Sequence, residues 1–429
     1  MESLWQPVKL PEFPRLEQNI KTDVLIIGGG MAGLLCAYFL KQKNVDCVLV
    51  EGNRICSGVT GNTTAKITAQ HGTIYYKLLK KYGTDVAELY YKANTDALAC
   101  YRRLCTKIHC DFKISDSILY CRDDATELEK EMAALERISA PTKWTEKTEL
   151  PFSVTGAICM TEQAQFHPLK FLDHIVRGLP IYEHTAVRSF DGKAYHTDFG
   201  TIYAEQAVVA THFPMWNKHG LYPLKLYQDR SYVMALENAP SLSGMYHDAD
   251  SNGLSFRSAG KLLLLGGGSH RTGKTGQGWQ DAAAAQYYPE SEIAFRWATQ
   301  DCITLDGMPY IGRYSKNTPN LYVAAGFNKW GMTGAMAAAS LITDLVQGRD
   351  NPYETLFSPS RSMLHKQLAV NVLEAVAHLL KPTAPRCPHM GCALKWNSRE
   401  RSWDCPCHGS RFAEDGTCLD NPATGDLEQ

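Results

Sequence analysis

Residues 22–33, Thr-Asp-Val-Leu-Ile-Ile-Gly-Gly-Gly-Met-Ala-Gly, decide the fold of this 429-residue chain. Thr22 to Ile27 has the short apolar pattern of a buried strand, and Leu34 to Leu40 continues as a helical run. Strand, glycine-rich turn and helix in this order are typical of the first unit of a doubly wound α/β domain.

Three glycines of the turn have distinct expected roles. Gly28 permits the tight turn, Gly30 leaves room beside the backbone for a pyrophosphate, and Gly33 lets the helix pack closely on the strand. The helix N-terminus then faces the phosphate charge. A second apolar run, Cys47 to Val50, ends in Glu51, whose carboxylate is suited to a ribose hydroxyl and disfavours a 2′-phosphate. The sequence therefore predicts a dinucleotide site.

Composition excludes several classes of protein. Lys plus Arg (44) balance Asp plus Glu (45), so there is no overall basic field for nucleic acid or acidic lipid. The first twenty residues lack the pattern of a secretory signal, and no run reaches membrane-spanning length. Nine of the 14 cysteines are scattered without disulfide-like spacing, which favours the cytoplasm, while five crowd into the last 43 residues. A different module is expected from about residue 381.

Three later segments carry a resemblance to a known family. Residues 58–66 read Gly-Val-Thr-Gly-Asn-Thr-Thr-Ala-Lys, residues 304–312 read Thr-Leu-Asp-Gly-Met-Pro-Tyr-Ile-Gly, and Gly326 to Gly334 leads into an alanine-rich helix, Ala335 to Val346. Together with the glycine turn they resemble the D-amino-acid oxidase and glycine oxidase superfamily over roughly residues 20–350.

The resemblance implies FAD rather than NAD as the dinucleotide. It also implies that residues 210–212, Ala-Thr-His, close the site, and that a helix N-terminus is aimed at the flavin ring. The expected cofactor-binding residues are Gly28, Gly30, Gly33, Glu51, Thr60, Gly61, Thr63, Thr64, Val187, Asp306, Gly331 and Thr333.

A second strand-to-glycine pattern, Leu262 to Gly268, is a weaker match to a nucleotide site. Position 271 is Arg where the third glycine belongs, and no helical pattern follows. We interpret it as the end of a strand in a substrate domain. Without a separate NAD(P)H module, electrons are expected to come from an organic substrate oxidised at the flavin.

The inserts between the flavin segments are helical (85–106) or alternate like antiparallel strands (227–268), and the resemblance implies that they form the substrate domain. No residue set in them is a diagnostic catalytic constellation, and an isolated His or Arg is more often structural than catalytic. The weak catalytic candidates are Lys66, His71, Arg257, His270 and Arg296.

The carboxyl end carries a second motif. Residues 387–392 read Cys-Pro-His-Met-Gly-Cys and residues 405–412 read Cys-Pro-Cys-His-Gly-Ser-Arg-Phe. Two thiolates can hold one iron of a [2Fe–2S] cluster and two imidazoles the other, although Cys and neutral His also suit zinc. Residues 387–423 resemble Rieske proteins.

That resemblance implies a ligand set and a disulfide. The ligands would be Cys387, His389, Cys405 and His408, with Cys392 and Cys407 paired as a disulfide. The module is short at its front, because an amphipathic helix over residues 364–379 ends just before the first ligand.

The predicted fold class is α/β: a Rossmann-like FAD-binding domain with an inserted α+β substrate domain, plus a small, shortened all-β Rieske-like module. The expected division is 1–355 for the oxidoreductase (FAD-binding segments near 20–84, 152–225 and 302–352; substrate segments near 85–151 and 226–301), 356–380 for a linker helix and 381–429 for the Rieske domain.

The sequence predicts a cytoplasmic FAD-dependent oxidoreductase that oxidises a small amine, amino acid or related CH-donor. Electrons would pass to the [2Fe–2S] cluster and on to an unidentified acceptor, without nucleic acid or a membrane span. One alternative is a plain FAD oxidase that uses oxygen and keeps a structural Rieske remnant; another is a non-catalytic redox sensor or electron carrier. A Rieske hydroxylase is disfavoured, because its mononuclear iron needs two His and a carboxylate, and no two His here are spaced five apart.

Overall fold

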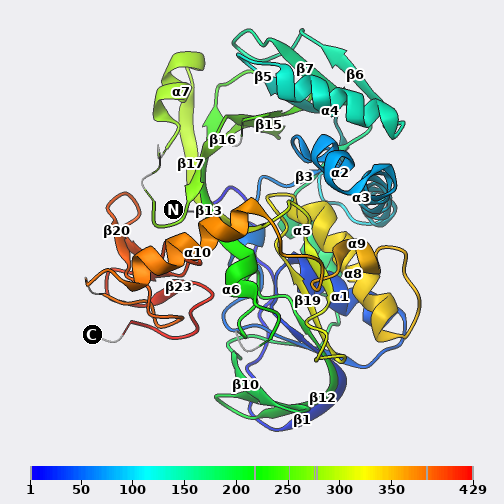
Figure 1. Cartoon of the computed structure of the whole chain (residues 1–429), viewed down its shortest axis with the longest axis vertical. Coiled ribbons are helices and arrows are strands. Elements are labelled where there is room, and N and C mark those ends of the chain that lie inside the picture. Colours follow the sequence, from blue (N-terminus) through cyan, green and yellow to red (C-terminus); the bar gives the residue numbers. More distant parts are fainter. Residues whose placement is uncertain are drawn as a thin grey trace.

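The computed structural model of the chain describes all residues except 1, 217–218, 251, 275, 277–278, 383–384 and 428–429. Within the described part, two eight-stranded sheets form the body of the molecule, and a four-stranded module lies at one side of it (Figure 1). The predicted fold class, an α/β nucleotide-binding fold with a C-terminal all-β module, is confirmed.

The first sheet is the dinucleotide-binding fold. β1 pairs in parallel with β2 and β12, and β12 pairs in parallel with β19. Two helices, α1 (Met31–Gln42) and α8 (Gly331–Val346), pack against each other beside it. The strands are β1 (Ile20–Ile27), β2 (Cys47–Val50), β9 (Ile181–Tyr182), β10 (Val187–Asp191), β11 (Ala194–Thr197), β12 (Thr201–Val209), β18 (Tyr310–Arg313) and β19 (Leu321–Ala325).

The second sheet forms the insert. Its order is β17-β13-β16-β15-β14-β5-β7-β6. β7 pairs with β5 and β6, so residues 156–160 belong to this sheet, although the expected division placed them in an FAD-binding segment. The strands are β5 (Ser117–Cys121), β6 (Thr142–Thr145), β7 (Gly156–Met160), β13 (Leu226–Glu237), β14 (Met245–Asp248), β15 (Ser255–Ala259), β16 (Leu262–Arg271) and β17 (Glu292–Thr304).

The second glycine-rich pattern lies inside β16, which continues as a strand through Gly266 to Gly268 and ends at Arg271. A strand that runs on through the glycines offers no turn and no helix N-terminus to a phosphate. The interpretation of residues 262–268 as a strand, and not as a second nucleotide site, is therefore confirmed.

Most remaining elements cover the two sheets. The predicted helix at 85–106 is α3 (Thr84–Cys105), which packs on α8. The others are α2 (Ile74–Tyr82), α4 (Thr126–Arg137), α5 (Pro168–Ile175), α6 (Tyr222–Lys225), α7 (Asp281–Tyr287), α9 (Glu354–Phe357), the short 3-10 helix η1 (Val59–Asn62), and the small sheet of β3 (Lys66–Ile67), β4 (Lys113–Ile114) and β8 (Ala164–Gln165).

The C-terminal module is an antiparallel sheet of four short strands, joined to the body by helix α10 (Lys366–Leu379). Figure 1 shows α10 in orange, running from the body to the red module. The strands are β20 (Lys395–Asn397), β21 (Ser402–Asp404), β22 (Arg411–Ala413) and β23 (Cys418–Asp420). The two cysteine-containing loops lie outside these strands, at residues 387–392 and 405–410.

Candidate functional site

A single large cavity of about 1490 Å³ connects the glycine turn with the C-terminal module. Its wall includes Gly28 and Glu51 at one end, Lys66 and His71 in the middle, and Asn421 at the other end. Every segment that the sequence analysis assigned to the FAD site contributes to this wall, so the structure brings those distant parts of the chain together.

The glycines of the turn have different steric surroundings. Gly28 has a φ of +112°, and a Cβ added there would lie 2.5 Å from the Ala210 carbonyl oxygen. A Cβ on Gly33 would lie 1.9 Å from the Gly28 carbonyl oxygen. A Cβ on Gly30 meets only the Thr60 hydroxyl, at 3.3 Å, and otherwise faces the cavity. Gly28 and Gly33 are thus required by the fold, whereas the space above Gly30 fits a pyrophosphate.

Glu51 lies at the end of β2 with its carboxylate facing the turn. Its Oε2 accepts the Gly29 N–H at 2.7 Å and its Oε1 accepts the Asn53 N–H at 2.9 Å. Burial raises the pKa of this carboxyl, despite these backbone donors. Each oxygen keeps a second lone pair, so the group fits the expected contact with a ribose hydroxyl.

The loop at residues 58–66 covers the N-terminus of α1. The Thr60 hydroxyl accepts the Met31 N–H at 3.0 Å, and the Trp5 indole donates to the Thr63 carbonyl at 2.7 Å. Trp5 is almost completely buried. Sequence reasoning missed this support, because nothing local in residues 1–10 indicates where the segment packs.

Of the residues predicted around the flavin ring, Asp306 and Gly331 line the cavity, whereas Thr333 is buried and does not. The Thr333 hydroxyl lies 3.2 Å from His71 Nε2, and no atom lies within 4 Å of a Cβ added to Gly331. The Asp306 carboxylate instead forms a buried ion pair with Arg361, at 2.7 and 2.8 Å. Arg361 was not predicted, since nothing in the sequence links two charges 55 residues apart.

Val187 is buried at the start of β10 and lines the same cavity near Glu51. Gly61 is close-packed, since a Cβ there would lie 2.5 Å from the Cys56 carbonyl oxygen. Thr64 faces the cavity. These positions agree with the expected course of the cofactor-binding segments.

Two of the five weak catalytic candidates face the cavity. Lys66 Nζ donates to the Tyr246 carbonyl at 3.0 Å and the Ser255 hydroxyl at 3.1 Å, and burial, assisted by nearby Arg257, lowers its pKa to about 7. The His71 ring stacks on Trp330 with centroids 4.8 Å apart, and burial lowers its pKa to about 3. His71 is therefore neutral near pH 7, whereas Lys66 is divided between its charged and neutral forms.

The other three candidates do not line the cavity. Arg257 is buried and donates to the Ala65 carbonyl at 2.8 Å, Arg296 pairs with Asp281, and His270 Nδ1 lies 3.0 Å from the Gly268 carbonyl. These geometries agree with structural roles.

His247 is a cavity residue that the sequence analysis missed. It is buried on β14, its ring packs edge-on against Trp330 with centroids 5.1 Å apart, and it lines the cavity. Neither ring nitrogen has a hydrogen-bond partner among the described residues. Burial, together with the charges of Lys66 and His71, lowers its pKa well below the usual value. A lone histidine within a strand carries no pattern that distinguishes it.

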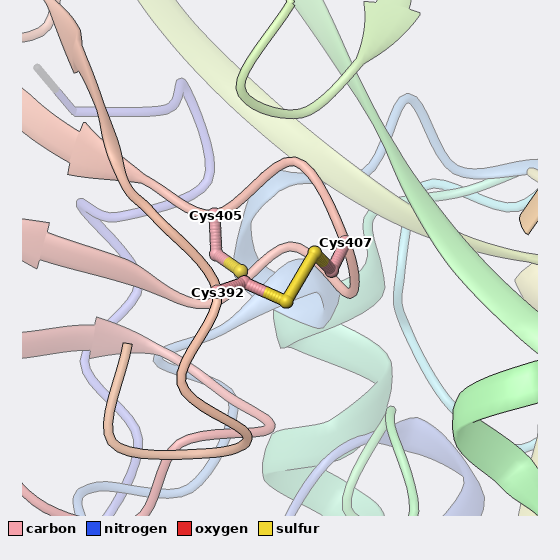
Figure 2. Close-up of side chains that lie close together, drawn as sticks. All are labelled: Cys392, Cys405 and Cys407. Carbon is pink, nitrogen blue, oxygen red and sulfur yellow. A yellow bond between two sulfur atoms is a disulfide. The ribbon is translucent and has the colours of Figure 1, made fainter. Parts of the chain in front are cut away.

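The C-terminal loops bring four cysteines and two histidines together. Figure 2 shows the Cys392–Cys407 disulfide beside Cys405. Ligand atoms of these three cysteines lie within 4.8 Å of one another, but sulfurs joined in a disulfide are not thiolate ligands, so this trio is not a metal site. The Cys387 thiol interacts with that of Cys405, which lowers the pKa of Cys387 to about 7. The predicted disulfide is confirmed.

The two histidines of the motif lie beside each other, with ring centroids 5.0 Å apart. His408 is buried, and its Nε2–H donates to the Pro223 carbonyl at 3.0 Å. Its Nδ1 is buried and has no hydrogen-bond partner among the residues that the structure describes. Metal-ligating histidines commonly donate a hydrogen bond from one ring nitrogen to a carbonyl and bind the metal through the other. His408 fits this pattern, with Nε2–H as the donor and Nδ1 as the ligand atom. Burial lowers the pKa of His408 to about 3 and of His389 to about 4, which favours the neutral, ligating form.

The module docks on β13 through Gln228, which is 1% exposed. Its Nε2 donates to the carbonyls of His408 and Asn421 at 2.8 and 2.9 Å. Its Oε1 accepts from His212 and Gln300 at 2.9 and 3.0 Å. Both donors and both lone pairs of the amide are satisfied, so this one side chain joins the cavity wall to the second cysteine loop.

Charged groups reinforce the same interface. Arg271 donates to the carbonyls of Pro406 and Cys407, both at 2.9 Å. Arg230 on β13 pairs with Glu400 of the module, Nε to Oε1 at 3.0 Å and NH2 to Oε2 at 2.5 Å. Because both partners of this pair are buried, the contact is not a mobile surface ion pair.

Comparison with known proteins agrees with this geometry. The sequence profile of the FAD dependent oxidoreductase family matches residues 23–345, and that of the Rieske [2Fe-2S] domain matches residues 359–429. The putative Rieske 2Fe-2S iron-sulfur protein YhfW of Bacillus subtilis strain 168 is 32% identical, over all of this chain and 97% of that protein. Gamma-glutamylputrescine oxidoreductase of Escherichia coli K12 is 23% identical, over 79% of this chain and 86% of that protein.

Solved structures share the fold of the body. Glycine oxidase from Geobacillus kaustophilus has a TM-score of 0.66 at 21% identity, covering 80% of this chain and 99% of that one. L-Proline dehydrogenase from P. horikoshii has the same TM-score at 18% identity, covering 81% and 98%. The family implies FAD and a [2Fe–2S] cluster, and the cradle above Gly30 and the free Nδ1 of His408 fit these groups. The chain therefore belongs to the FAD dependent oxidoreductase family and ends in a Rieske [2Fe-2S] domain.

Proposed function

We propose that this oxidoreductase oxidises a small amine or amino acid at FAD and delivers the electrons to its own Rieske cluster. The observation that carries the proposal is the single cavity, whose wall runs from the FAD cradle to the docked cluster module. Relatives named glycine oxidase and gamma-glutamylputrescine oxidoreductase support the amine or amino-acid class of substrate.

The cofactor contacts in this proposal follow the geometry of the cavity. Gly30 and the α1 N-terminus hold the pyrophosphate, Glu51 binds a ribose hydroxyl, and Gly331 and Thr333 lie at the flavin ring. Cys387, Cys405, His389 and His408 hold the cluster. Bound FAD supplies a two-electron acceptor for a hydride from the substrate.

Lys66 is the proposed base. An amine gives up a hydride from its carbon only as the neutral free base, so an ammonium substrate must first lose a proton. Lys66 Nζ faces the cavity, and its pKa of about 7 lets it accept that proton near neutral pH. His71 and His247, which also line the cavity, are neutral at that pH and so add no positive charge to it.

Electron delivery is supported by the docking contacts. Oxidation of each substrate molecule yields two electrons. Because the [2Fe–2S] cluster holds one electron at a time, it must pass them one by one to an external acceptor. His212 lines the cavity and donates to Gln228, which in turn donates to the His408 carbonyl, so hydrogen bonds link the cavity wall to a proposed ligand. Imidazole ligation raises the potential of such a cluster relative to all-Cys clusters, which favours transfer from a reduced flavin.

The test is anaerobic mixing of the purified protein with a panel of amines and amino acids. Flavin absorbance and low-temperature spin resonance of the cluster are followed in the wild type and in His408→Ala. The control is His196→Ala, since His196 is an exposed residue of β11. We expect a panel member to reduce the flavin in all three proteins and the cluster in wild type and control only. Full flavin reduction with an oxidised, intact wild-type cluster would disprove the electron outlet and favour a plain oxidase.

A further inference from the structure

Helix α10 presents apolar residues to solvent and packs through polar ones. Within the helix only Asn371 and His378 are buried. The outward residues, which we call the apolar face of α10, are Ala369, Val370, Val372, Leu373, Val376, Ala377, Leu379 and Leu380. At 100° per residue these eight positions cover about half of the helix circumference. The sequence analysis predicted an amphipathic helix here, but its apolar side is not the packed side.

This orientation is fixed by specific contacts. Asn371 Oδ1 accepts from Arg271 at 2.9 Å, and Asn371 Nδ2 donates to the Leu224 carbonyl at 3.2 Å. Glu374 is paired with Lys274, and the His378 carbonyl accepts the Ala393 N–H at 3.0 Å. Turning the apolar face inward would break these contacts, so its exposure is a property of the docked module.

The exposure is large for a water-soluble surface. Leu373 is 68% exposed, Leu380 is 77% exposed, and Leu364, just before the helix, is 85% exposed. Contiguous apolar patches on monomeric proteins are usually small, and larger ones mark interaction sites. The apolar face of α10 therefore needs a partner that covers it.

The charges around the face indicate the sign of that partner. Exposed Lys366 begins the helix, and Lys381 follows its end. At the C-terminal end, Arg386 donates hydrogen bonds to the Leu379 and Gly391 carbonyls. The pKa of Lys395 is lowered first by burial and second by the positive charge of Lys381, so these two lysines lie near each other. The one acidic residue of α10 is Glu374, which is already paired. Both ends of the apolar face are therefore basic.

A second copy of the chain does not fit this pattern. Antiparallel pairing of two α10 helices would bring the basic C-terminal end of one against Lys366 of the other, and parallel pairing would join like ends. Either orientation sets like charges side by side, which opposes association. An anionic partner gains from both ends.

The composition of the face separates lipid from protein. It consists of Ala, Val and Leu only, without the Trp, Tyr and Arg that anchor most protein–protein contacts. An aliphatic face flanked by basic residues suits a helix that lies in the interface of an anionic membrane. None of the helices among the described residues is long and apolar enough to cross a membrane, so α10 would lie flat. We propose that the apolar face of α10 docks the protein on an anionic lipid surface.

Docking there would bring the first cluster loop to the lipid. Leu379 Cδ2 lies 3.9 Å from the position of a Cβ on Gly391, and Met390 is 46% exposed. The whole-chain charge balance, which indicated no field for acidic lipid, does not reveal this local arrangement. The inference does not depend on the substrate, since none of the eight residues of the apolar face lines the cavity.

The experiment is flotation of the holoprotein with vesicles of phosphatidylcholine, with or without phosphatidylglycerol. We expect binding to the mixed vesicles, weaker binding to phosphatidylcholine alone, and release by salt. Leu373→Glu should lower the fraction of protein bound to the vesicles about tenfold or more. The substitution removes an aliphatic group that would be buried in the lipid and adds a negative charge. The matched control is Ile293→Glu, on β17, where Ile293 is 40% exposed and does not line the cavity.

The flavin content, the iron content and the mass by light scattering are measured for both variants. We expect all three quantities to match those of the wild type. Vesicle binding that Leu373→Glu leaves unchanged would overturn the proposal. A wild-type protein that does not bind mixed vesicles would also overturn it. If that protein is a dimer and Leu373→Glu dissociates it, the apolar face binds a second copy of the chain instead.

Discussion

Replacing Arg230 with Met tests how firmly the cluster module is held on the flavin body. Arg230 contributes two of the buried hydrogen bonds across the interface, both to Glu400, whose side chain is 2% exposed. Glu400 also accepts from Arg411 of its own module at 3.0 Å. The substitution therefore removes one of the contacts between the two parts while leaving the Glu400 carboxylate paired with Arg411. Met preserves most of the aliphatic volume of the side chain.

The expected cost follows from the type of hydrogen bond that is lost. A hydrogen bond to a charged group contributes about 1.5–3 kcal/mol, and the retained Arg411 contact offsets part of the loss, so we expect about 3 kcal/mol. That corresponds to roughly a hundredfold larger population of undocked module. By contrast, removing Glu400 would also take one of the three carboxylate partners from Arg411 and so disturb the module itself.

Hydrogen–deuterium exchange of residues 395–420, at unchanged flavin and iron content, measures this population. Arg401→Met is the matched control, because Arg401 pairs with Glu414 at the surface of the same module and such pairs contribute about 0–1 kcal/mol. We expect faster exchange in Arg230→Met only. Equal protection in both variants would refute the view that the buried pair holds the module in place.

The structure supports three further predictions. Gly30→Val should yield a folded protein without FAD, because its Cβ meets little but the cavity, whereas Gly33→Ala should disturb folding itself; flavin content and circular dichroism separate the two, and FAD retained by Gly30→Val would contradict the cradle. Cys387→Ser should remove most of about two irons and two sulfides per chain, while Cys418→Ser keeps them; zinc without sulfide in the wild type would contradict the ligand set. Burial raises the pKa of Glu131 from 4.5 to about 7, so the folded state binds the extra proton between these values and the unfolding free energy should fall as pH rises from 5 to 7; urea titrations should show that slope, up to about 1.4 kcal/mol per pH unit, flattened in Glu131→Gln.

Local sequence motifs predicted the residues that would bind FAD and the cluster. They did not predict the contacts between residues far apart in the chain. The Gly28 turn, Glu51 and the Cys387–His408 pattern carry their chemistry in spacing, because a tight turn or a ligand loop constrains neighbouring residues. Gln228 and Arg361 act through partners far along the chain. Nothing near them in sequence distinguishes them from ordinary strand and loop residues.

The same limit applies to the second sheet and to α10. Alternation predicted strands near residues 227–268, but only pairing places β7 beside β5. Periodicity predicted the helix now seen at Lys366–Leu379, and a helical pattern states which residues share a face without stating which face is buried. Hydrogen bonds from Asn371 decided that orientation.

The hydrogen bond from His408 Nε2 to the Pro223 carbonyl joins the Rieske module to the flavin body at a single imidazole. A carbonyl that accepts from the remote nitrogen makes the other nitrogen a stronger electron donor, which stabilises oxidised iron. The reduction potential of the cluster is then a joint property of both parts rather than of the Rieske module alone. A module severed from the body should be easier to reduce than the same module in place, so electrochemistry of the cluster would report whether the two halves are assembled.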